Sequence, residues 1–340
     1  MMQDNPAVAR LKARFDPERP AIAMAAHNPL AAKLAAAAGF DAIWGSGFEL
    51  SASYAVPDAN ILSVDTHLEL MRAMVGMAEE LGFKDEAAAE YDRAFAHVTA
   101  HFMPFLLRAA HLAPGMHALD IATGTGLSAE VALAAVGPTG HVTAADVSPA
   151  MAEKARERLS KAPNVSVSVE DGQALSFSDE NLDAVLCNLG LMFFSDPMQG
   201  LSEFRRVLRP GGRAAVSVNT VVERSYNHQI NVIIARYAPS LAEAVTRTFA
   251  LGEASRLQLL FSEAGFVDIE THTVKHTFVL PSFDAYYGPF ERGGASTGQA
   301  LAALPEEIRR AVREEVRRDL ADSGGPVEAE AEYRIASARR

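Results

Sequence analysis

The chain has 340 residues, 49% of them hydrophobic, which is enough for two domains with real cores. Its formal net charge of −12 and its short, acid-interrupted basic runs, as in 309–318, argue against a nucleic-acid substrate. The single cysteine, Cys187, excludes an internal disulfide, and the lack of an apolar signal core or a run of eighteen apolar residues predicts a cytoplasmic protein with no membrane span.

The N-terminal segment predicts a small βαβ unit. Apolar runs at 21–26 and 42–44 predict strands, and the alanine-rich stretch 29–38 between them predicts a helix. Residues 67–81 have the spacing of one amphipathic helix that leads directly into the next part of the chain. We therefore expect two parts, residues 1–78 and 79–340.

Within the first part, a motif around Trp44, Ser46 and Gly47, followed by Asp58, resembles the start of the phosphoenolpyruvate mutase and isocitrate lyase superfamily, over about residues 15–75. The resemblance implies a phosphonate pocket at the first three residues and an acidic catalytic role for Asp58. The alternative is a purely structural role, in which Trp44 is a packed aromatic, the glycine-rich stretch around it is a turn and Asp58 caps a loop.

The same segment departs from that superfamily in its metal ligands. The paired metal-binding aspartates of the superfamily have no counterpart in this sequence, and a metal site needs its oxygen ligands. Two of eight barrel units also cannot close a barrel. We expect an incomplete (β/α) barrel fragment that acts as a packing module, a lid or a dimerisation surface, without mutase or lyase activity.

The most informative stretch follows a predicted helix at 86–107. Residues 117–122 predict a buried strand, 123–126 a turn with little side chain, 127–136 a helix and 141–145 a second strand. This is the strand, glycine turn and helix of a nucleotide-like cofactor site, because backbone without side chains lets a ligand approach closely.

The glycine spacing alone does not decide the cofactor. Gly124, Gly126 and Ala129 satisfy the pattern allowed for dinucleotides, and Asp146, twenty residues after Gly126, is where ribose hydroxyls need a carboxylate. Asp120 lies inside the first strand, where it could accept from an amino group or a water; a dinucleotide has no need of it. The alternative is a purely structural role, in which the turn is only a tight strand–helix connection and Asp146 caps a helix.

Further elements follow in a regular order. The remaining predicted pieces alternate strand and helix up to a glycine-rich turn and a fifth strand. They are a strand at 165–169 ending in Glu170, Asp171, Gly172 and Gln173, a strand at 182–187 opening into Asn188 and Leu189, a helix at 199–207 and a strand at 214–218.

At this point the chain resembles the class I S-adenosylmethionine-dependent methyltransferases, in particular the small-molecule branch of ubiquinone and menaquinone type. The resemblance covers about residues 85–280 and rests on five ordered matches: LDIATGTG, Asp146, EDGQAL, DAVLCNLGLMFFSDP and FRRVLRPGGR. It implies an α/β fold, a doubly wound Rossmann-like sheet that carries the N-terminal βαβ fragment as an appendage, and S-adenosyl-L-methionine as the cofactor.

The resemblance also implies residue roles. Asp120, Ala122, Thr123, Gly124 and Gly126 would hold the methionine end of the cofactor. The remaining cofactor residues would be Asp146 and Val147 at the ribose, Asp171, Gly172 and Gln173 at the adenine, and Asn188 and Leu189 beside the sulfonium.

The sequence indicates the residues that would contact the methyl acceptor less specifically. The helix at 86–107 resembles the roof of the cofactor pocket and carries Tyr91, a catalytic candidate beside Asp92. An insertion at about 219–255 would contact the substrate and contains His228, the best histidine candidate for a general base. Both residues have plain structural interpretations, as a core aromatic and as a solvated histidine.

We expect the C-terminal part to finish the sheet and cover the site. Closing strands are predicted at 266–271 and 274–280, separated by a turn at His272, and a lid or helical region at about 281–340.

We expect an enzyme that transfers a methyl group from S-adenosylmethionine to a small-molecule acceptor by in-line displacement, with a second copy of the chain as a candidate partner. The sequence contains no metal-ligand spacing and needs none for this reaction. Two alternatives stay open: a phosphonate-metabolism enzyme that uses the N-terminal segment, and a non-catalytic regulatory protein that binds S-adenosylmethionine.

Overall fold

The structure is a computed structural model, and it describes four stretches of the chain: residues 23–26, 42–45, 85–239 and 248–340. The chain divides into two compact units, Met1–Gly82 and Phe83–Arg340, and each is described by itself.

In the first unit, the described residues form two parallel strands, β1 (Ala23–Ala26) and β2 (Ala42–Gly45). Parallel strands need a crossover connection, so this pairing is the one that a βαβ unit requires. The two predicted strands are confirmed. The other predicted features of this unit lie outside the described residues: the helices at 29–38 and 67–81, and the motif residues Ser46, Gly47 and Asp58.

In the second unit, the described residues build a seven-stranded sheet with the order β5-β4-β3-β6-β7-β9-β8. The strands are β3 (His117–Ile121), β4 (His141–Asp146), β5 (Val165–Val169), β6 (Leu182–Asn188), β7 (Leu208–Asn219), β8 (Val267–Leu280) and β9 (Val327–Arg339). The first five in spatial order are parallel, whereas β9 runs antiparallel to both of its neighbours. The connections reverse between β3 and β6, which makes the sheet doubly wound.

Helices cover both faces of this sheet. One face carries α5 (Asp85–Ala109), α6 (Leu127–Val136) and α7 (Pro149–Leu159). The other face carries α8 (Pro197–Val207), α11 (Ala254–Glu263) and the short 3₁₀ helix η1 (Leu191–Phe193). Side chains alternate between the two layers along each strand: Leu186 contacts the first layer, while Val185 and Cys187 contact the second.

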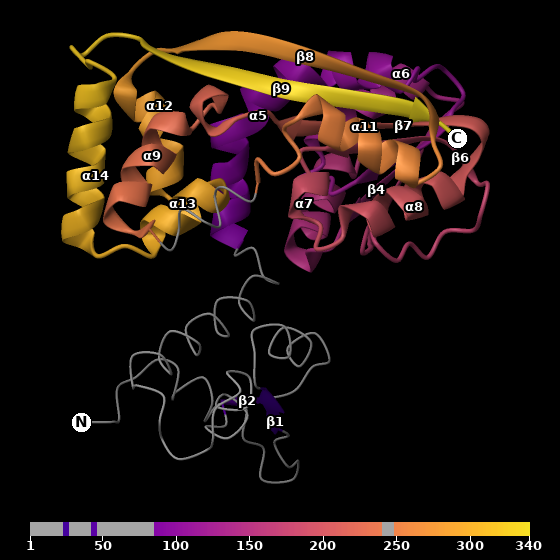
Figure 1. Ribbon diagram of the computed structural model, residues 1–340, viewed down its shortest axis with the longest axis horizontal. Helices are drawn as coiled ribbons and strands as arrows, with labels where there is room; N and C mark the ends of the chain where they lie inside the picture. The colour runs from indigo at the N-terminus through magenta and orange to yellow at the C-terminus, as the bar shows by residue number, and fades with distance from the viewer. Residues whose placement is uncertain (1–22, 27–41, 46–84, 240–247) are drawn as a thin grey trace. The chain divides into compact units, whose positions relative to one another are not determined.

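A further group of helices gathers at one end of the second unit, beyond α5 (Figure 1). Its members are η2 (Val222–Arg224), α9 (His228–Tyr237), α12 (Phe283–Glu291), α13 (Ala295–Ala302) and α14 (Glu306–Asp319). Apart from η2, which has no buried residue, they share an aromatic-rich core with the first half of α5 and with parts of β8 and β9. In that core, Tyr286, Tyr287 and Phe290 are at most 2% exposed.

Local signals fix where helices begin. The side chain of Ser148 accepts a hydrogen bond from the Met151 amide, and Pro149 follows as the first residue of α7. Asp196 caps α8 in the same way, accepting from the Gln199 amide at 3.0 Å. Such caps satisfy amides that have no partner within the helix. The cap at Ser148 starts α7 soon after β4 and so fixes Asp146 at the end of its strand.

Most predicted elements are confirmed, and two of them, 127–136 and 165–169, match α6 and β5 residue for residue. Two predictions for the C-terminal part are wrong. β8 is one continuous strand through His272, because its pairing with β9 continues there as His272 with Ile335.

The expected helical region over 281–340 is helical only as far as Asp319, because Val327–Arg339 forms β9. Its glutamates and alanines are good helix formers, yet pairing with β7 on one side and β8 on the other overrides that propensity. The buried positions Val327, Ala329 and Ala331 show the period of two that a strand requires.

Candidate functional site

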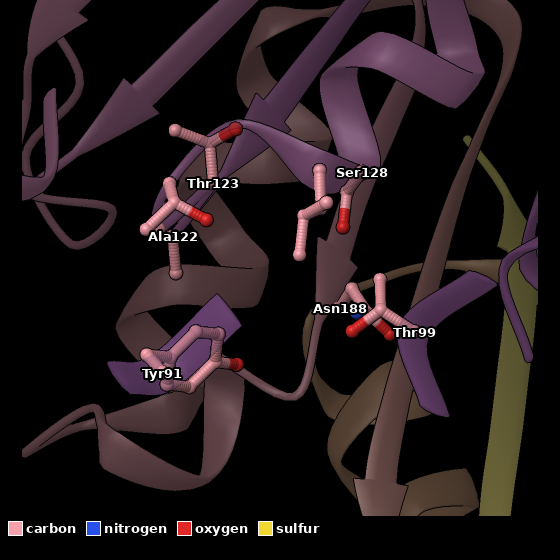
Figure 2. Close-up of a pocket in the computed structure, with 9 residues that line it drawn as sticks. Tyr91, Thr99, Ala122, Thr123, Ser128 and Asn188 are labelled. Carbon is pink, nitrogen blue, oxygen red and sulfur yellow. The ribbon is translucent and has the colours of Figure 1, made fainter. Parts of the chain in front are cut away.

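A pocket lies at the carboxyl ends of β3 and β6, where the connections of the sheet reverse. In open α/β sheets this is the usual place for a ligand. The pocket has a cavity volume of about 20 Å³. Figure 2 shows that α5, the turn after β3 and the end of β6 contribute side chains to it. Its lining residues are Tyr91, Thr99, Ala122, Thr123, Gly124, Thr125, Leu127, Ser128 and Asn188.

The turn between β3 and α6 presents its backbone to the pocket. Gly124 and Gly126 have left-handed φ angles of 57° and 86°, and so does Ala122 at 56°. A Cβ on Gly124 would meet no atom within 4 Å, whereas a Cβ on Gly126 would meet the Ala155 Cα at 3.1 Å. Gly124 therefore keeps space open for a ligand, while Gly126 lets the turn pack against α7.

Asp146 braces this turn from the end of β4. Its Oδ2 accepts from the Gly124 amide at 2.8 Å, and its Oδ1 accepts from the Ser148 amide at 2.9 Å. Burial raises the pKa of Asp146, and these two hydrogen bonds oppose the rise. Each carboxylate oxygen has a further lone pair, so the group can still accept from a ligand's hydroxyls. Next to it, Val147 is 56% exposed, which leaves an apolar surface free for a ligand ring.

Asp120 is the most unusual titratable group of the site. It is fully buried, its Oδ2 accepts from the Thr123 hydroxyl at 2.6 Å, and its Oδ1 has no hydrogen-bond partner in the protein. Burial raises the pKa of Asp120 to about 7. A buried acceptor without a partner favours a donor from outside the chain, such as an ammonium group or a water. This fits the methionine end of S-adenosylmethionine.

The loop after β5 carries Asp171, Gly172 and Gln173. A Cβ on Gly172 would lie 2.4 Å from the Phe194 ring, so this glycine is needed for packing. The Gln173 side chain is held in place by hydrogen bonds: its Oε1 accepts from the Asp196 amide at 2.7 Å and from the Ser195 hydroxyl. These three residues shape the loop, and none of them lines the pocket.

At the end of β6, Asn188 lines the pocket and Leu189 turns the chain. The Asn188 Oδ1 accepts from the Ser217 hydroxyl at 2.7 Å, which leaves its amide nitrogen free to orient toward a ligand. Leu189 has a φ of 54°, an unusual value for a residue with a branched side chain. Ala122 and Leu189 thus place backbone strain at both strand ends beside the pocket, as is common at functional sites.

Sequence reasoning missed part of the lining: Thr99, Thr125, Leu127 and Ser128. Thr99 could have been found, because it lies eight residues after Tyr91 and therefore on the same face of the predicted roof helix. Figure 2 shows Thr99 next to Asn188. The other three follow the glycine turn directly and are placed by its backbone.

Of the two catalytic candidates, only Tyr91 lines the pocket. Burial raises the pKa of Tyr91 to about 12, with further contributions from Asp92 and Asp146. Its phenol is therefore protonated near neutral pH and is a hydrogen-bond donor rather than a ready base.

His228 begins α9 and is not part of the pocket lining. Its Nδ1 is buried without a hydrogen-bond partner in the protein. The structure therefore gives His228 no contact with the pocket that a proton transfer would use. Among the described residues, no group of three His, Cys, Asp or Glu side chains could hold a metal ion, and no described helix is long and apolar enough to cross a membrane.

Comparison with known families divides the chain in the same way as the sequence motifs. Residues 119–216 match the family described as a methyltransferase domain. Residues 11–81 match the family described as phosphoenolpyruvate phosphomutase.

Two curated relatives match different parts of the chain. A phosphonopyruvate hydrolase from Variovorax is 73% identical over 64 residues, which are 19% of this chain and 22% of the hydrolase. A demethylmenaquinone methyltransferase from Clavibacter sepedonicus is 35% identical over 171 residues, which are 48% of this chain and 67% of that enzyme. The chain thus spans about a fifth of the first relative and two thirds of the second.

Among solved structures, a phosphoethanolamine N-methyltransferase from Haemonchus contortus, in complex with phosphomonomethylethanolamine and S-adenosylhomocysteine, matches 76% of this chain and 58% of its own. The TM-score is 0.52 at 19% sequence identity, so this likeness concerns the fold alone.

Proposed function

The chain belongs to the S-adenosylmethionine-dependent methyltransferases, and we propose that it transfers the methyl group to a small-molecule acceptor by in-line displacement. The observation that carries the proposal is an arrangement of three groups at one pocket: Gly124 in its lining with open space beside it, the carboxylate of Asp146 bonded to the Gly124 amide, and the carboxylate of Asp120, with one orphan oxygen, bonded to the lining residue Thr123. They are suited to a close-lying backbone contact, ribose hydroxyls and an ammonium group, respectively.

The bound cofactor supplies a methyl group on a positively charged sulfur. The acceptor's lone pair forms a bond to that methyl carbon while the carbon–sulfur bond breaks, leaving a neutral thioether. The protein's part is to align the partners and exclude water. In our proposal Asp120 and Gly124 hold the methionine end of the donor, and Asp146 and Val147 hold its ribose. The loop of Asp171, Gly172 and Gln173 shapes the adenine side, and Asn188 and Leu189 lie beside the sulfonium.

We assign Tyr91 a covering and donating role in the roof of the site. Its raised pKa supports this assignment, because a phenol that stays protonated can hold an acceptor oxygen by donating to it. We assign His228 the role of a general base only for an acceptor that is large enough to extend from the pocket to the start of α9. A phenol or amine acceptor must lose a proton, and a carbon acceptor must first become an enolate.

The test is methyl transfer by the full-length chain with labelled S-adenosylmethionine and a panel of phenols, amines and quinols. Formation of S-adenosylhomocysteine together with a labelled acceptor is the expected result. Tight cofactor binding without transfer to any class of the panel would favour the regulatory alternative. We also propose a cytoplasmic location and pairing with a second copy of the chain, both of which are predictions from the sequence.

We further propose that the N-terminal segment has no phosphonate chemistry of its own. The matched stretch is 22% of the related hydrolase, and its described residues form two strands of what would be an eight-stranded barrel. Phosphorus NMR on the full chain with magnesium and phosphonopyruvate tests this proposal. Conversion that disappears in Asp58→Ala would establish a second activity instead.

A further inference from the structure

The roof helix and the floor of the pocket are joined by a cluster of polar side chains, of which only Thr125 lines the pocket. Asp92, next to Tyr91 on α5, accepts a hydrogen bond from the hydroxyl of Thr125 in the glycine turn. Its other carboxylate oxygen is ion-paired with Arg158 near the end of α7. Neither Asp92 nor Arg158 lines the pocket, so these two side chains support the roof helix and the glycine turn from outside the lining.

Arg158 connects the cluster to a third and a fourth element. Its Nε donates to the backbone carbonyl of Thr125 at 2.8 Å, and its Nη1 lies 3.3 Å from a carboxylate oxygen of Glu130 on α6. A planar guanidinium presents its donors in a fixed fork, so one side chain can hold several partners in a set geometry. The arrangement thus ties α5, the glycine turn, α6 and α7 together.

The cluster is more protected than an ordinary surface ion pair. Thr125 is 3% exposed, and the Arg158 and Asp92 side chains are 25% and 30% exposed. On the same helix, the pair of Arg156 with Glu153 is 47% and 60% exposed, and it joins residues of one helix only. Exposed pairs of that kind contribute about 0 to 1 kcal/mol. The matched arginine two positions away therefore serves as a natural control.

The position of the cluster relates it to access. Thr125 lies between the two glycines of the turn, and Tyr91, beside Asp92, lines the pocket from the roof. The cavity volume of the pocket is about 20 Å³, room for about one water molecule and far below the roughly 300 Å³ at which small-molecule sites begin. A cofactor therefore enters only when roof and floor separate, and the Asp92 bonds to Thr125 and Arg158 hold them together.

We propose that Asp92, Thr125 and Arg158 form a clasp that sets how often the pocket opens, and so controls both the entry of S-adenosylmethionine and the release of its product. This inference rests on the proposed function of the same pocket. Asp92 and Arg158 are positioning residues, because they act through Tyr91 and the glycine turn. The clasp requires that weakening it accelerates entry and release together, whereas loss of a direct ligand contact accelerates release alone.

The test measures association and dissociation rates of S-adenosylhomocysteine on the immobilised full-length chain by surface plasmon resonance. In Asp92→Ala and in Arg158→Ala we expect both rates to rise, roughly five- to thirty-fold, with a smaller change in Kd. The double variant should resemble either single variant, because the residues act as one unit. Arg158→Lys, which keeps the charge but not the fork, should lie between wild type and Arg158→Ala.

Arg156→Ala is the control and should leave both rates within twofold of wild type. Rates unchanged in Asp92→Ala and Arg158→Ala, or an increase in dissociation alone, would overturn the clasp while leaving the cofactor site intact. No binding of S-adenosylhomocysteine by the wild-type chain would overturn the proposed function and the clasp with it. If Arg158→Ala fails to fold, Asp92→Asn removes the charge that pairs with Arg158 while keeping the size of the side chain, which gives the same comparison outside the pocket lining.

Discussion

The pocket and the aromatic cluster of the second unit are built by different means. The pocket is shaped mainly by backbone amides, positive φ angles and a few carboxylates, as in the hydrogen bonds of Asp146 with the Gly124 and Ser148 amides. In the aromatic cluster, side-chain rings contact one another: the Phe95 and Phe290 centroids lie 5.6 Å apart, and Tyr226 and Tyr286 lie 5.6 Å apart.

This difference separates binding from stability. Carboxylates at the pocket have burial costs that a ligand can offset, so changing them should alter affinity more than folding. Large apolar rings in the cluster contribute packing and apolar burial, so changing them should alter folding more than affinity. The predictions below test that separation, from the largest expected effect to the smallest.

The largest effect is expected from Phe290→Ala in the aromatic cluster. Phe290 is fully buried, and the loss of such a ring costs about 3 to 5 kcal/mol of unfolding free energy. Chemical denaturation measures it, with Phe193→Ala as the control, because Phe193 is 61% exposed. Equal losses in the two variants would mean that the cluster is not a packed core.

Asp146→Ala should weaken S-adenosylhomocysteine binding by about 1.5 to 3 kcal/mol, through loss of a charged acceptor. Its matched control is Asp183→Ala at the opposite end of the sheet, where the carboxylate also accepts from a backbone amide, that of His117, at 2.8 Å. Calorimetry should show normal binding in the control. Equal affinity in both variants would remove Asp146 from the site.

Asp120→Asn should affect stability and binding in opposite directions. The folded-state pKa of Asp120, about 7, lies above its ordinary value, so the wild type loses stability as pH rises from about 4 to about 7 and has lost all of that contribution above 7. The variant should therefore unfold at a higher temperature than wild type at pH 8. It should also bind more weakly there, by about 1 to 3 kcal/mol, since the charge that pairs with an ammonium group is gone.

In the wild type, binding should strengthen as pH rises through about 7, where Asp120 ionises. Calorimetric titrations at several pH values check this dependence in both proteins. A pH profile that is the same in wild type and Asp120→Asn would show that this carboxyl does not meet the ligand.

The smallest effect on folding is expected from glycine replacements. Gly124 and Gly211 both have left-handed φ angles, 57° and 86°, and a Cβ on either would meet no atom within 4 Å. Alanine at either position should cost about 1 to 2 kcal/mol of stability, because of its backbone conformation. Only Gly124→Ala should also reduce binding of S-adenosylhomocysteine. Binding that survives in Gly124→Ala as it does in Gly211→Ala would make the turn purely structural.

The same difference explains how far the sequence could be interpreted. The pocket is built from local signals, since a strand, a turn of small residues and a capped helix lie together in the chain, and this made Asp120, Gly124 and Asp146 predictable. β9 joins β7 from more than a hundred positions away. Its first residues alternate apolar and charged as a strand does, but their alanines and glutamates favour a helix, and this local propensity misled the prediction. The clasp residue Arg158 depends on how α7 packs against the turn, which the spacing of one helix does not reveal, whereas Thr99 follows from its spacing with Tyr91 on α5.

The central claim is that the pocket at the carboxyl ends of β3 and β6 holds S-adenosylmethionine. Isothermal titration of the full-length chain with S-adenosylhomocysteine, repeated with a nicotinamide dinucleotide, tests it most directly. The account predicts one site per chain for S-adenosylhomocysteine, weakened in Asp146→Ala and retained in Asp183→Ala, with no comparable binding of the dinucleotide. Tighter binding of the dinucleotide, or no binding of S-adenosylhomocysteine by a folded chain, would contradict it.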